Sequence, residues 1–420
     1  MNLSKTQFRG KIQLPSSKSH TMRAILLASL GRGESVLLNP LFSPDTQAML
    51  QAIEAFGAKW QHVENGLKIF GVGRVPEKLK RSAICAGNSG QVLRFASAFY
   101  AQSRTPILVT GDDSLQQLRP CKTLVDSLKS LGAFLTSLSP MGAAPLLIQG
   151  PISSGTCSLS GIDSQPVSAL LMSLSLLDGP SHIHVHDLGE RPWIDLTLDW
   201  MKRLHLRFTE TKDGFFLPGG DHIEPFQRVI PGDLSALAFP LVLGLITHST
   251  ISISGVDLSD IQGDKAILDV ISQMGGKYSY DPKLYTITVS GPQKLKGVAI
   301  DVNPIIDALP SLAVLACFAE GTTRLYNGAI ARKKESDRIH AMAHELQKMG
   351  AKVIEQPDGL EIEGVGSLNS AILETYHDHR VAMALACAAF ASSGTSKLNN
   401  PEVVQKSFPN FFEQLRSIAV

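Results

Sequence analysis

The chain repeats one pattern six times with a period of about 70 to 75 residues, and this period constrains its fold more than any single motif. In each copy an apolar run ends at a turn of small residues, and a segment rich in Ser, Thr and Val follows. The turns fall near Gly33, Ser103, Gly179, His248, Gly321 and Gly394. A run that is apolar all round is typical of a buried helix, and the segment after it is typical of a short strand. We therefore expect six similar units.

A second, amphipathic helix is predicted half a period after each apolar run. Residues 46–60 and 339–353 are clear examples, and in both a glycine precedes a β-rich segment. Glycine is common immediately after the last turn of a helix. Each unit thus alternates two helices with short strands, so the predicted fold class is α/β, with the apolar helices buried.

The domain boundary is predicted from a break in the repeat. A chain of 420 residues that is 44% hydrophobic is expected to form two domains, and six units divide into three plus three. The pattern is interrupted by Pro and Gly near residues 229–232. We predict an N-terminal domain over residues 14–229 and a C-terminal domain over 230–420. The last unit lacks a following strand, so residues 1–13 are expected to return and complete the C-terminal domain.

Bulk composition excludes several functional classes. The net charge is +1, from 39 basic and 38 acidic residues, so no global field attracts nucleic acid or an anionic membrane. The five cysteines are odd in number and widely spaced, unlike a disulfide framework or a CxxC metal site. The longest apolar run, residues 236–246, is too short to span a bilayer. We expect a monomeric cytoplasmic protein without a metal or cofactor.

Cationic residues recur at the predicted helix starts in both domains. They are Lys18, Arg23, Arg94, Arg119, Arg191, Lys334, Arg338, Arg380 and Lys406. A helix N-terminus carries partial positive charge and free N–H groups, so a cation there is unfavourable unless an anion is bound. One such position is compatible with scattered surface charge. Their recurrence predicts that both domains bind a shared anionic ligand in an interdomain cleft.

Two carboxylates lie within this basic set. Asp307 opens a nearly all-apolar run, where it could act as a helix N-cap, and Glu335 lies beside Lys334 with Arg338 three residues later. Either residue alone is adequately explained as a cap or a solvated ion pair. Together, amid Lys and Arg, they are equipped for proton transfer to and from an anionic substrate.

The motifs that carry these residues follow one another in the order of a known family. They are PSSKSHTMR (15–23), GNSGQVLRF (87–95), DSQPVSALLM (163–172), RKKESDR (332–338), DHR (378–380) and KSFPNFF (406–412). The chain resembles the enolpyruvyl transferase family, and within it the 5-enolpyruvylshikimate-3-phosphate synthases. This resemblance implies two pseudo-symmetric domains, each of three βαβαββ repeats with buried parallel helices, like an α/β barrel turned inside out. It also implies that the domains close on two small-molecule substrates, shikimate 3-phosphate and phosphoenolpyruvate, and release phosphate.

The resemblance assigns a role to each matching residue. Phosphoenolpyruvate would be held by Lys18, Gly90, Arg119, Gln165, Arg338, Arg380 and Lys406. Shikimate 3-phosphate would be held by Lys18, Ser19, Arg23, Ser164, Gln165, Asp307 and Lys334, with Ser19 and Arg23 on its carboxylate. Asp307 would take the proton of the 5-hydroxyl as it attacks. Glu335 and Lys334 would manage the proton at the methylene carbon, through a tetrahedral intermediate.

The chain departs from the family pattern on the acceptor side. Asp163 and Glu190 stand where the family usually has serine contacts to the acceptor phosphate, and a carboxylate there should repel phosphate unless it is protonated or turned away. Trp193 replaces a tyrosine and could stack on the ring. Asn88 and Arg94 are further candidate contacts.

Two other functions stay open at this point. A transferase acting on UDP-N-acetylglucosamine would carry a reactive cysteine five residues before the Arg119–Pro120 pair, where this chain has Ser114. An inactive anion-binding relative is conceivable because of Asp163 and Glu190. The alternating His182, His184 and His186 could ligate a metal on one strand face, but no partner motif completes such a site and an exposed strand face is favoured.

Overall fold

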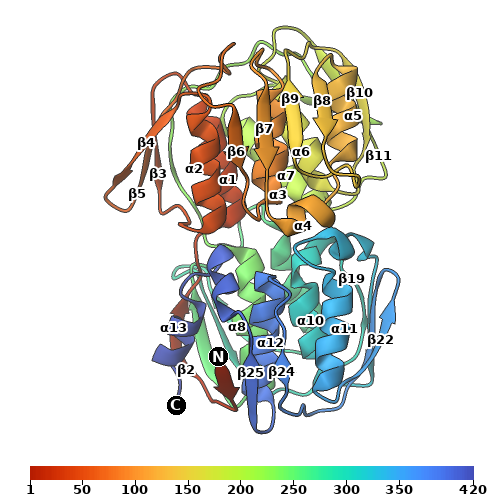
Figure 1. The fold of residues 1–420 in the computed structure, drawn as a ribbon. Helices are drawn as coiled ribbons and strands as arrows, with labels where there is room; N and C mark the ends of the chain where they lie inside the picture. The colour runs from red at the N-terminus through yellow and green to blue at the C-terminus, as the bar shows by residue number, and fades with distance from the viewer. The chain divides into compact units, whose positions relative to one another are not determined.

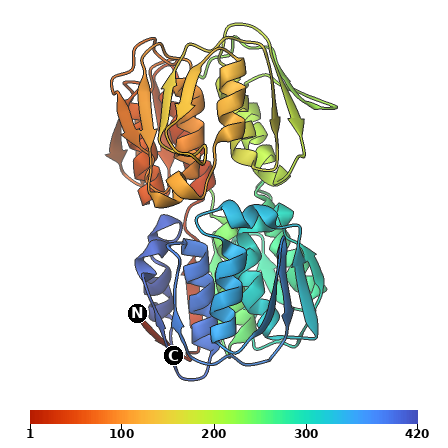
Figure 2. The ribbon, with the colours of Figure 1, turned by 45° about the vertical axis from the view of Figure 1, so that its right-hand side comes forward.

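The computed structural model describes residues 1–420, which form two compact units. The terminal unit consists of Met1–Pro15 and Pro231–Val420, and the inserted unit consists of Ser16–Ile230. In each unit, helices run side by side in the interior and small sheets lie outside them (Figures 1 and 2). None of the helices combines the length and the apolar character needed to cross a bilayer.

The inserted unit contains three four-stranded sheets, with strand orders β14-β3-β5-β4, β6-β7-β9-β8 and β10-β11-β13-β12. Its strands are β3 (Glu34–Leu38), β4 (Lys59–Val63), β5 (Gly66–Phe70), β6 (Ala83–Cys85), β7 (Ile107–Thr110), β8 (Phe134–Ser137), β9 (Leu146–Gln149), β10 (Thr156–Ser160), β11 (Ser181–His186), β12 (Thr209–Thr211), β13 (Gly214–Leu217) and β14 (Gln227–Val229). Its helices are α1 (Lys18–Ser29), α2 (Pro44–Glu54), α3 (Gly90–Tyr100), α4 (Asp113–Gln117), α5 (Lys122–Ser130), α6 (Ser164–Leu174) and α7 (Arg191–Arg203).

The terminal unit has sheets of order β16-β17-β15-β2, β19-β21-β23-β22 and β1-β25-β24, and a β18-β20 pair. Its strands are β1 (Asn2–Ser4), β2 (Arg9–Gln13), β15 (Thr250–Ser254), β16 (Tyr278–Asp281), β17 (Thr286–Ser290), β18 (Leu295–Lys296), β19 (Ala299–Asp301), β20 (Ala319–Glu320), β21 (Thr322–Tyr326), β22 (Lys352–Gln356), β23 (Gly359–Glu363), β24 (Ile372–Leu373) and β25 (Thr395–Leu398). Its α-helices are α8 (Leu234–Ile246), α9 (Ile267–Gln273), α10 (Leu309–Cys317), α11 (Arg338–Lys348), α12 (His379–Ala391) and α13 (Phe411–Ser417). Four 3₁₀ helices complete it, η1 (Gly263–Ala266), η2 (Asn303–Ala308), η3 (Ala329–Lys333) and η4 (Pro401–Lys406).

One pairing rule recurs in all the four-stranded sheets. Each contains one parallel pair and two antiparallel pairs, as where β10 runs parallel to β11 and β11 runs antiparallel to β13. A strand reached through a crossover helix pairs in parallel, whereas a hairpin pairs antiparallel. The residues before α1 take part in two sheets of the terminal unit, because β2 pairs in parallel with β15 and β1 pairs antiparallel with β25.

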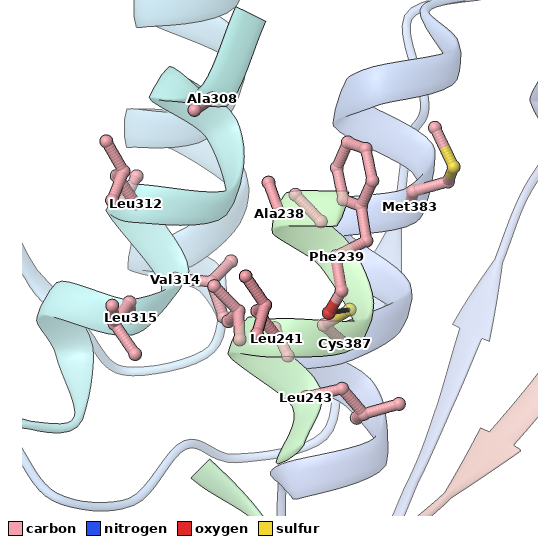
Figure 3. Packing of buried hydrophobic residues seen from close by; sticks show 14 of the residues in the cluster. Ala238, Phe239, Leu241, Leu243, Ala308, Leu312, Val314, Leu315, Met383 and Cys387 are labelled. Atoms are coloured by element: carbon pink, nitrogen blue, oxygen red, sulfur yellow. Dashed lines mark hydrogen bonds between the residues drawn. The ribbon is translucent and has the colours of Figure 1, made fainter. Parts of the chain in front are cut away.

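The apolar helices form the interior of each unit. In the terminal unit every residue of α8 is buried, and α8, α10 and α12 contact one another (Figure 3). The thiol of Cys387 donates a hydrogen bond to the carbonyl oxygen of Phe239 at 3.4 Å, so even this polar atom has a partner. A fully buried leucine contributes about 1.5–3 kcal/mol, so the buried side chains of these helices contribute strongly to the stability of the unit.

The predicted α/β class with repeated units and buried helices is confirmed. The strands do not close into a barrel: each sheet remains separate, and helices rather than strands occupy the interior. This arrangement places the starts of several buried helices within a few residues of the cationic motifs.

A glycine at the interface of α8 and β17 provides a test of this packing. A Cβ atom on Gly244 would lie 2.4 Å from Cγ1 of Val289. We expect Gly244→Ala to lower the free energy of unfolding by about 1–3 kcal/mol through overpacking. Adding Val289→Ala should relieve the clash, so that the double variant is less destabilised than the sum of the single ones in denaturant titrations.

The matched control is Gly155→Ala, where the nearest side-chain atom to a new Cβ would be Cδ2 of Leu131 at 3.6 Å. This substitution should change the free energy of unfolding by less than about 1 kcal/mol. Strict additivity of Gly244→Ala and Val289→Ala would contradict the proposed close contact.

Candidate active site

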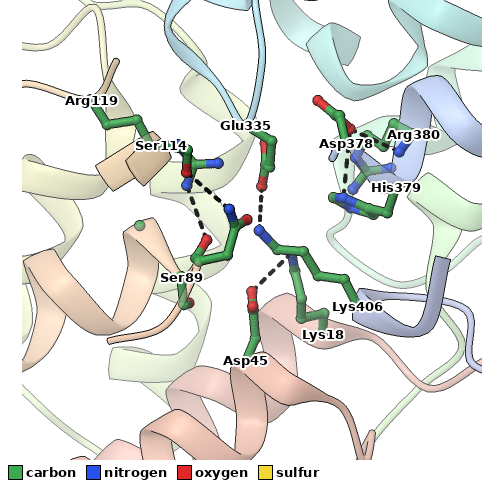
Figure 4. Close-up of polar contacts among 12 residues, drawn as sticks. Lys18, Asp45, Ser89, Ser114, Arg119, Glu335, Asp378, His379, Arg380 and Lys406 are labelled. Carbon is green, nitrogen blue, oxygen red and sulfur yellow. Dashed lines mark hydrogen bonds and ion pairs between the residues drawn. The ribbon is translucent and has the colours of Figure 1, made fainter. Parts of the chain in front are cut away.

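The first cationic motif is fixed at the start of α1. The hydroxyl of Ser17 caps this helix by accepting a hydrogen bond from the backbone N–H of His20 at 3.4 Å. Nζ of Lys18 lies 3.3 Å from Oδ2 of Asp45, which belongs to the first turn of α2 (Figure 4). Both side chains are buried. The ion pair therefore holds the ammonium group in a defined position at the start of the helix.

Arg23 is a buried cation whose partners are all neutral. Its guanidinium donates to the hydroxyl of Thr197 at 2.8 Å and to the carbonyl oxygens of Ser19 and Trp193 at 3.1 Å each. It also lies 5.2 Å from the ring centroid of Phe95. Burial lowers the pKa of Arg23 to about 9. Since a buried charge is costly unless it is paired, this position is suited to the anionic group of a ligand.

Three polar side chains converge on Gly90 at the start of α3. A Cβ atom at this position would lie 2.8 Å from Nη1 of Arg94, 3.0 Å from Oε1 of Gln165 and 3.1 Å from Nη1 of Arg119. Nη1 of Arg119 also donates to the carbonyl oxygen of Asn88 at 3.3 Å (Figure 4). Only glycine leaves room for this cluster, so the two guanidinium groups can lie against the backbone at the start of α3.

The two acidic departures from the family pattern are both engaged near the start of α6. Asp163 caps α6 by accepting from the backbone N–H of Gln165 at 3.0 Å, and its other oxygen lies 3.1 Å from Nη2 of Arg94. Glu190 is buried, and its Oε2 accepts from the backbone N–H of Ser164 at 3.2 Å and from the Ser164 hydroxyl at 3.1 Å. Asp163 is therefore paired with a cation, whereas Glu190 occupies the anion-binding groups of Ser164.

In the terminal unit, Arg338 connects three carboxylates. It is the first residue of α11 and is 1% exposed. Its guanidinium contacts Oδ1 of Asp307 at 2.7 Å, Oε2 of Glu335 at 2.8 Å and Oδ2 of Asp378 at 2.8 Å. Arg380, near the start of α12, contacts Oδ2 of Asp307 at 2.8 Å. Each oxygen of Asp307 thus faces its own guanidinium.

These cations determine the protonation state of Asp307. Burial by itself would raise its pKa, but Arg380, Arg338 and Lys334 outweigh burial and lower the pKa to about 2. Asp307 is therefore ionised at neutral pH.

Glu335 links this network to the last cationic motif. Its Oε1 lies 2.8 Å from Nζ of Lys406, which is buried at the end of η4 (Figure 4). Lys334 is the residue directly after η3 and directly before Glu335. Asp307, Glu335, Arg338, Arg380 and Lys406 therefore form one connected network.

The sequence-predicted residues fall into separate groups in the inserted unit. Gly90, Arg94, Arg119, Asp163 and Gln165 lie together, and Glu190 joins them through Ser164. Lys18 with Asp45, and Arg23 with Ser19, form two further groups on α1 and its neighbours. Trp193 contacts Arg23 through its carbonyl oxygen.

Sequence reasoning missed a buried carboxyl group, Asp264. Its Oδ2 accepts a hydrogen bond from the hydroxyl of Ser235 at 2.6 Å, and its Oδ1 is buried without a hydrogen-bond partner. Burial, and then the charge of Asp307, raise the pKa of Asp264 to about 7, against a smaller opposing effect of Arg380. The polar segment around it resembles a surface loop, so the sequence holds no signal of its burial. Asp45 was missed for the same reason.

Solved structures share this architecture. The EPSP synthase from Acinetobacter baumannii matches 99% of this chain and 97% of its own with a TM-score of 0.80 at 27% identity. The enolpyruvyl transferase NikO from Streptomyces tendae matches 100% of this chain and 97% of its own with a TM-score of 0.77, and at 15% identity it supports the fold alone. The architecture is therefore that of the enolpyruvyl transferases.

Sequence comparison shows which family of enolpyruvyl transferases the chain is most similar to among those compared. The sequence model of the family described as EPSP synthase (3-phosphoshikimate 1-carboxyvinyltransferase) matches residues 4–415. The 3-phosphoshikimate 1-carboxyvinyltransferase of Chlamydia trachomatis serovar D is 43% identical over 410 residues, covering 96% of this chain and 90% of the relative. That of Ruminiclostridium cellulolyticum is 37% identical over 418 residues, covering 99% and 98%. The chain belongs to the EPSP synthase family, whose members are transferases of the shikimate pathway and of aromatic amino-acid biosynthesis.

This assignment confirms the resemblance predicted from the ordered motifs. The relatives share the shikimate-type name over nearly the whole chain, so the alternative acceptor UDP-N-acetylglucosamine is not favoured.

The buried carboxyl group Asp264 should make stability depend on pH. Because its folded-state pKa is raised to about 7, the folded chain keeps a proton between about pH 4 and pH 7 that the unfolded chain loses. Asp264 therefore lowers the free energy of unfolding as pH rises through this window. We expect Asp264→Asn to be more stable than the unmodified chain at pH 8 by at least about 1 kcal/mol, and to lose this advantage at pH 4.

The measurement is denaturant unfolding at both pH values, with Asp269→Asn on the exposed side of α9 as control. An equal effect of Asp264→Asn at pH 4 and pH 8 would show that the carboxyl group does not titrate in this range.

Proposed function

We propose how this chain carries out the reaction of its family, the transfer of the enolpyruvyl (1-carboxyvinyl) group of phosphoenolpyruvate to the 5-hydroxyl of shikimate 3-phosphate. The observation that carries the proposal is Asp307 held between Arg338 and Arg380, with Glu335 joined to Arg338 and to Lys406. Two carboxylates among cations can move protons in both directions while the cations bind a phosphate and a carboxylate.

The acceptor is bound mainly by the inserted unit in this proposal. Arg23 has only neutral partners, and with Ser19 it would hold the carboxylate of the acceptor. Ser164 and Gln165, at the start of α6, would contact its phosphate and ring. We assign this role to the N-terminal domain over residues 14–229.

Phosphoenolpyruvate would be bound by cations of both units. From the inserted unit these are Lys18 and Arg119, with the backbone of Gly90 and the amide of Gln165. From the terminal unit, which corresponds within two residues at each boundary to the C-terminal domain predicted over 1–13 and 230–420, they are Arg338, Arg380 and Lys406. Each is held in place by a carboxylate or a carbonyl, so little reorganisation is needed when the substrate binds.

Binding of phosphoenolpyruvate would also activate the base. Asp307 has a pKa of about 2 because Arg380 and Arg338 contact it, which makes it a weak proton acceptor in the free protein. When the phosphate and carboxylate of the substrate engage these guanidinium groups, their effect on Asp307 weakens and its pKa rises. Asp307 then accepts the proton of the 5-hydroxyl as that oxygen attacks C2 of phosphoenolpyruvate.

The addition and elimination steps also require a second acid–base group, which acts on C3 of phosphoenolpyruvate. Glu335 with Lys334 would deliver a proton to C3, which gives a tetrahedral intermediate with a methyl group. The same pair would remove a proton from that methyl group as the bond from C2 to the phosphate oxygen breaks. Phosphate leaves as hydrogen phosphate, taking up the proton that Asp307 accepted from the 5-hydroxyl, and the vinyl double bond re-forms. The two proton transfers at C3 then cancel, and both carboxylates return to their starting state. The Lys406–Glu335 and Arg338–Glu335 contacts position this carboxylate.

We further propose a monomeric cytoplasmic enzyme whose partners are its two substrates, with no nucleic acid or membrane partner. All five cysteines are free thiols, which fits a reducing compartment.

The base assignment predicts a loss of turnover without a loss of fold. Asp307→Asn should reduce kcat by about 10²- to 10⁴-fold, because it removes the proton acceptor. The assay follows phosphate release from both substrates, with each omitted in turn. Asp269→Asn, at an exposed position of α9, is the control and should leave kcat unchanged.

A near-normal kcat for Asp307→Asn would remove it from the base role. Binding of both substrates to the unmodified chain without any phosphate release would instead favour the inactive anion-binding relative.

The contact of Lys406 predicts a substrate-specific defect. Lys406→Ala should raise KM for phosphoenolpyruvate by about tenfold or more, because a charged hydrogen bond contributes roughly 1.5–3 kcal/mol, while KM for shikimate 3-phosphate changes little. Steady-state kinetics in both substrates measure this, with Lys397→Ala on β25 as an exposed control. An unchanged KM for phosphoenolpyruvate would show that Lys406 does not bind it.

A further inference from the structure

The side chain of Glu190 takes up an anion-binding position within the inserted unit. It is 1% exposed, and its Oε2 accepts from both the N–H and the hydroxyl of Ser164, at 3.2 and 3.1 Å. Its backbone has φ 44° and ψ 38°, a left-handed conformation that is uncommon for a residue other than glycine. Strained backbone of this kind persists where the surrounding structure requires a particular side-chain position.

The groups that Glu190 occupies are those an acceptor phosphate would use. Ser164 is the first residue of the 11-residue helix α6, where an N–H group without a partner inside the helix and the helix dipole favour an anion. Both donors of Ser164 are directed at the same carboxylate oxygen. The carboxylate therefore stands where one oxygen of a phosphate group would be held.

Two charged residues near this position in the sequence have ion-pair partners of their own. The carboxylate of Asp163 is already paired with Arg94 at 3.1 Å. Arg191, the residue after Glu190, directs its guanidinium to Asp195 and Glu210, with contacts of 2.7 and 2.6 Å. A phosphate that approaches Ser164 thus meets the buried carboxylate of Glu190.

We propose that Glu190 determines acceptor affinity by competing with the phosphate of shikimate 3-phosphate for Ser164. This inference rests on the proposed function, which places that phosphate at the start of α6. Two anions cannot share the same two donors, so the acceptor binds only when the carboxylate leaves Ser164. The displaced carboxylate loses two charge-assisted hydrogen bonds, and this loss weakens the net affinity. Phosphoenolpyruvate, held by other residues, is unaffected.

The test compares Glu190→Gln, which keeps the shape and removes the charge, with Glu190→Ser, which also vacates the position. Dissociation constants for shikimate 3-phosphate are measured by calorimetry on the full chain, and KM for both substrates by phosphate release. We expect both variants to bind shikimate 3-phosphate at least about tenfold more tightly, a change equivalent to roughly 1.4 kcal/mol. KM for phosphoenolpyruvate should stay within about twofold. Glu224→Gln, an exposed carboxylate of the same unit, is the control.

Unchanged or weaker binding of shikimate 3-phosphate by both variants would overturn the inference. The binding measurement does not depend on turnover, so absence of phosphate release from every protein would count against the proposed function alone. If neither variant folds, the test uses the unmodified chain and compares its affinities for shikimate 3-phosphate and for unphosphorylated shikimate. We expect the two affinities to differ by less than about tenfold. A larger difference would refute competition at Ser164.

Discussion

The double ion pair of Asp307 with Arg338 and Arg380 is the interaction on which the proposed chemistry depends. The three residues come from η2, α11 and α12, so the contact requires that the starts of these elements lie together in the terminal unit. The buried packing of α8, α10 and α12 supplies this arrangement. The apolar repeat therefore fixes the positions of charged groups that are far apart along the chain.

This arrangement buries several charged side chains close together, which is unfavourable for the protein without a bound ligand. Buried ion pairs do not by themselves stabilise a fold, because desolvation opposes the attraction between the charges. The neighbouring carboxyl group Asp264 shows the consequence, since burial and the charge of Asp307 raise its pKa. In the inserted unit, Arg23 has only neutral partners and Glu190 is held by Ser164. These features are better explained by the binding of charged ligands than by stability.

The sequence predicts the α/β class and the buried helices because a sixfold period and an all-apolar helix admit few other solutions. It also indicates which charged residues belong to the site, since the cations recur at predicted helix starts. It does not predict their partners. The ion pair of Asp163 with Arg94 is one example. The contact of Glu190 with Ser164 is another, because it accompanies a left-handed backbone at Glu190 that no residue pattern predicts. The burial of Asp264 was not predicted, because its neighbours in the sequence are polar and only tertiary packing buries its side chain.

The central claim is that substrate binding turns Asp307 from a weak base into an effective one. The most direct measurement is the pKa of its carboxyl group by ¹³C NMR titration, assigned with the Asp307→Asn variant, in the free protein and in the protein saturated with phosphoenolpyruvate. The account predicts a pKa of about 2 in the free protein and a clearly higher value in the complex. A pKa that is unchanged or lower in the complex would contradict it.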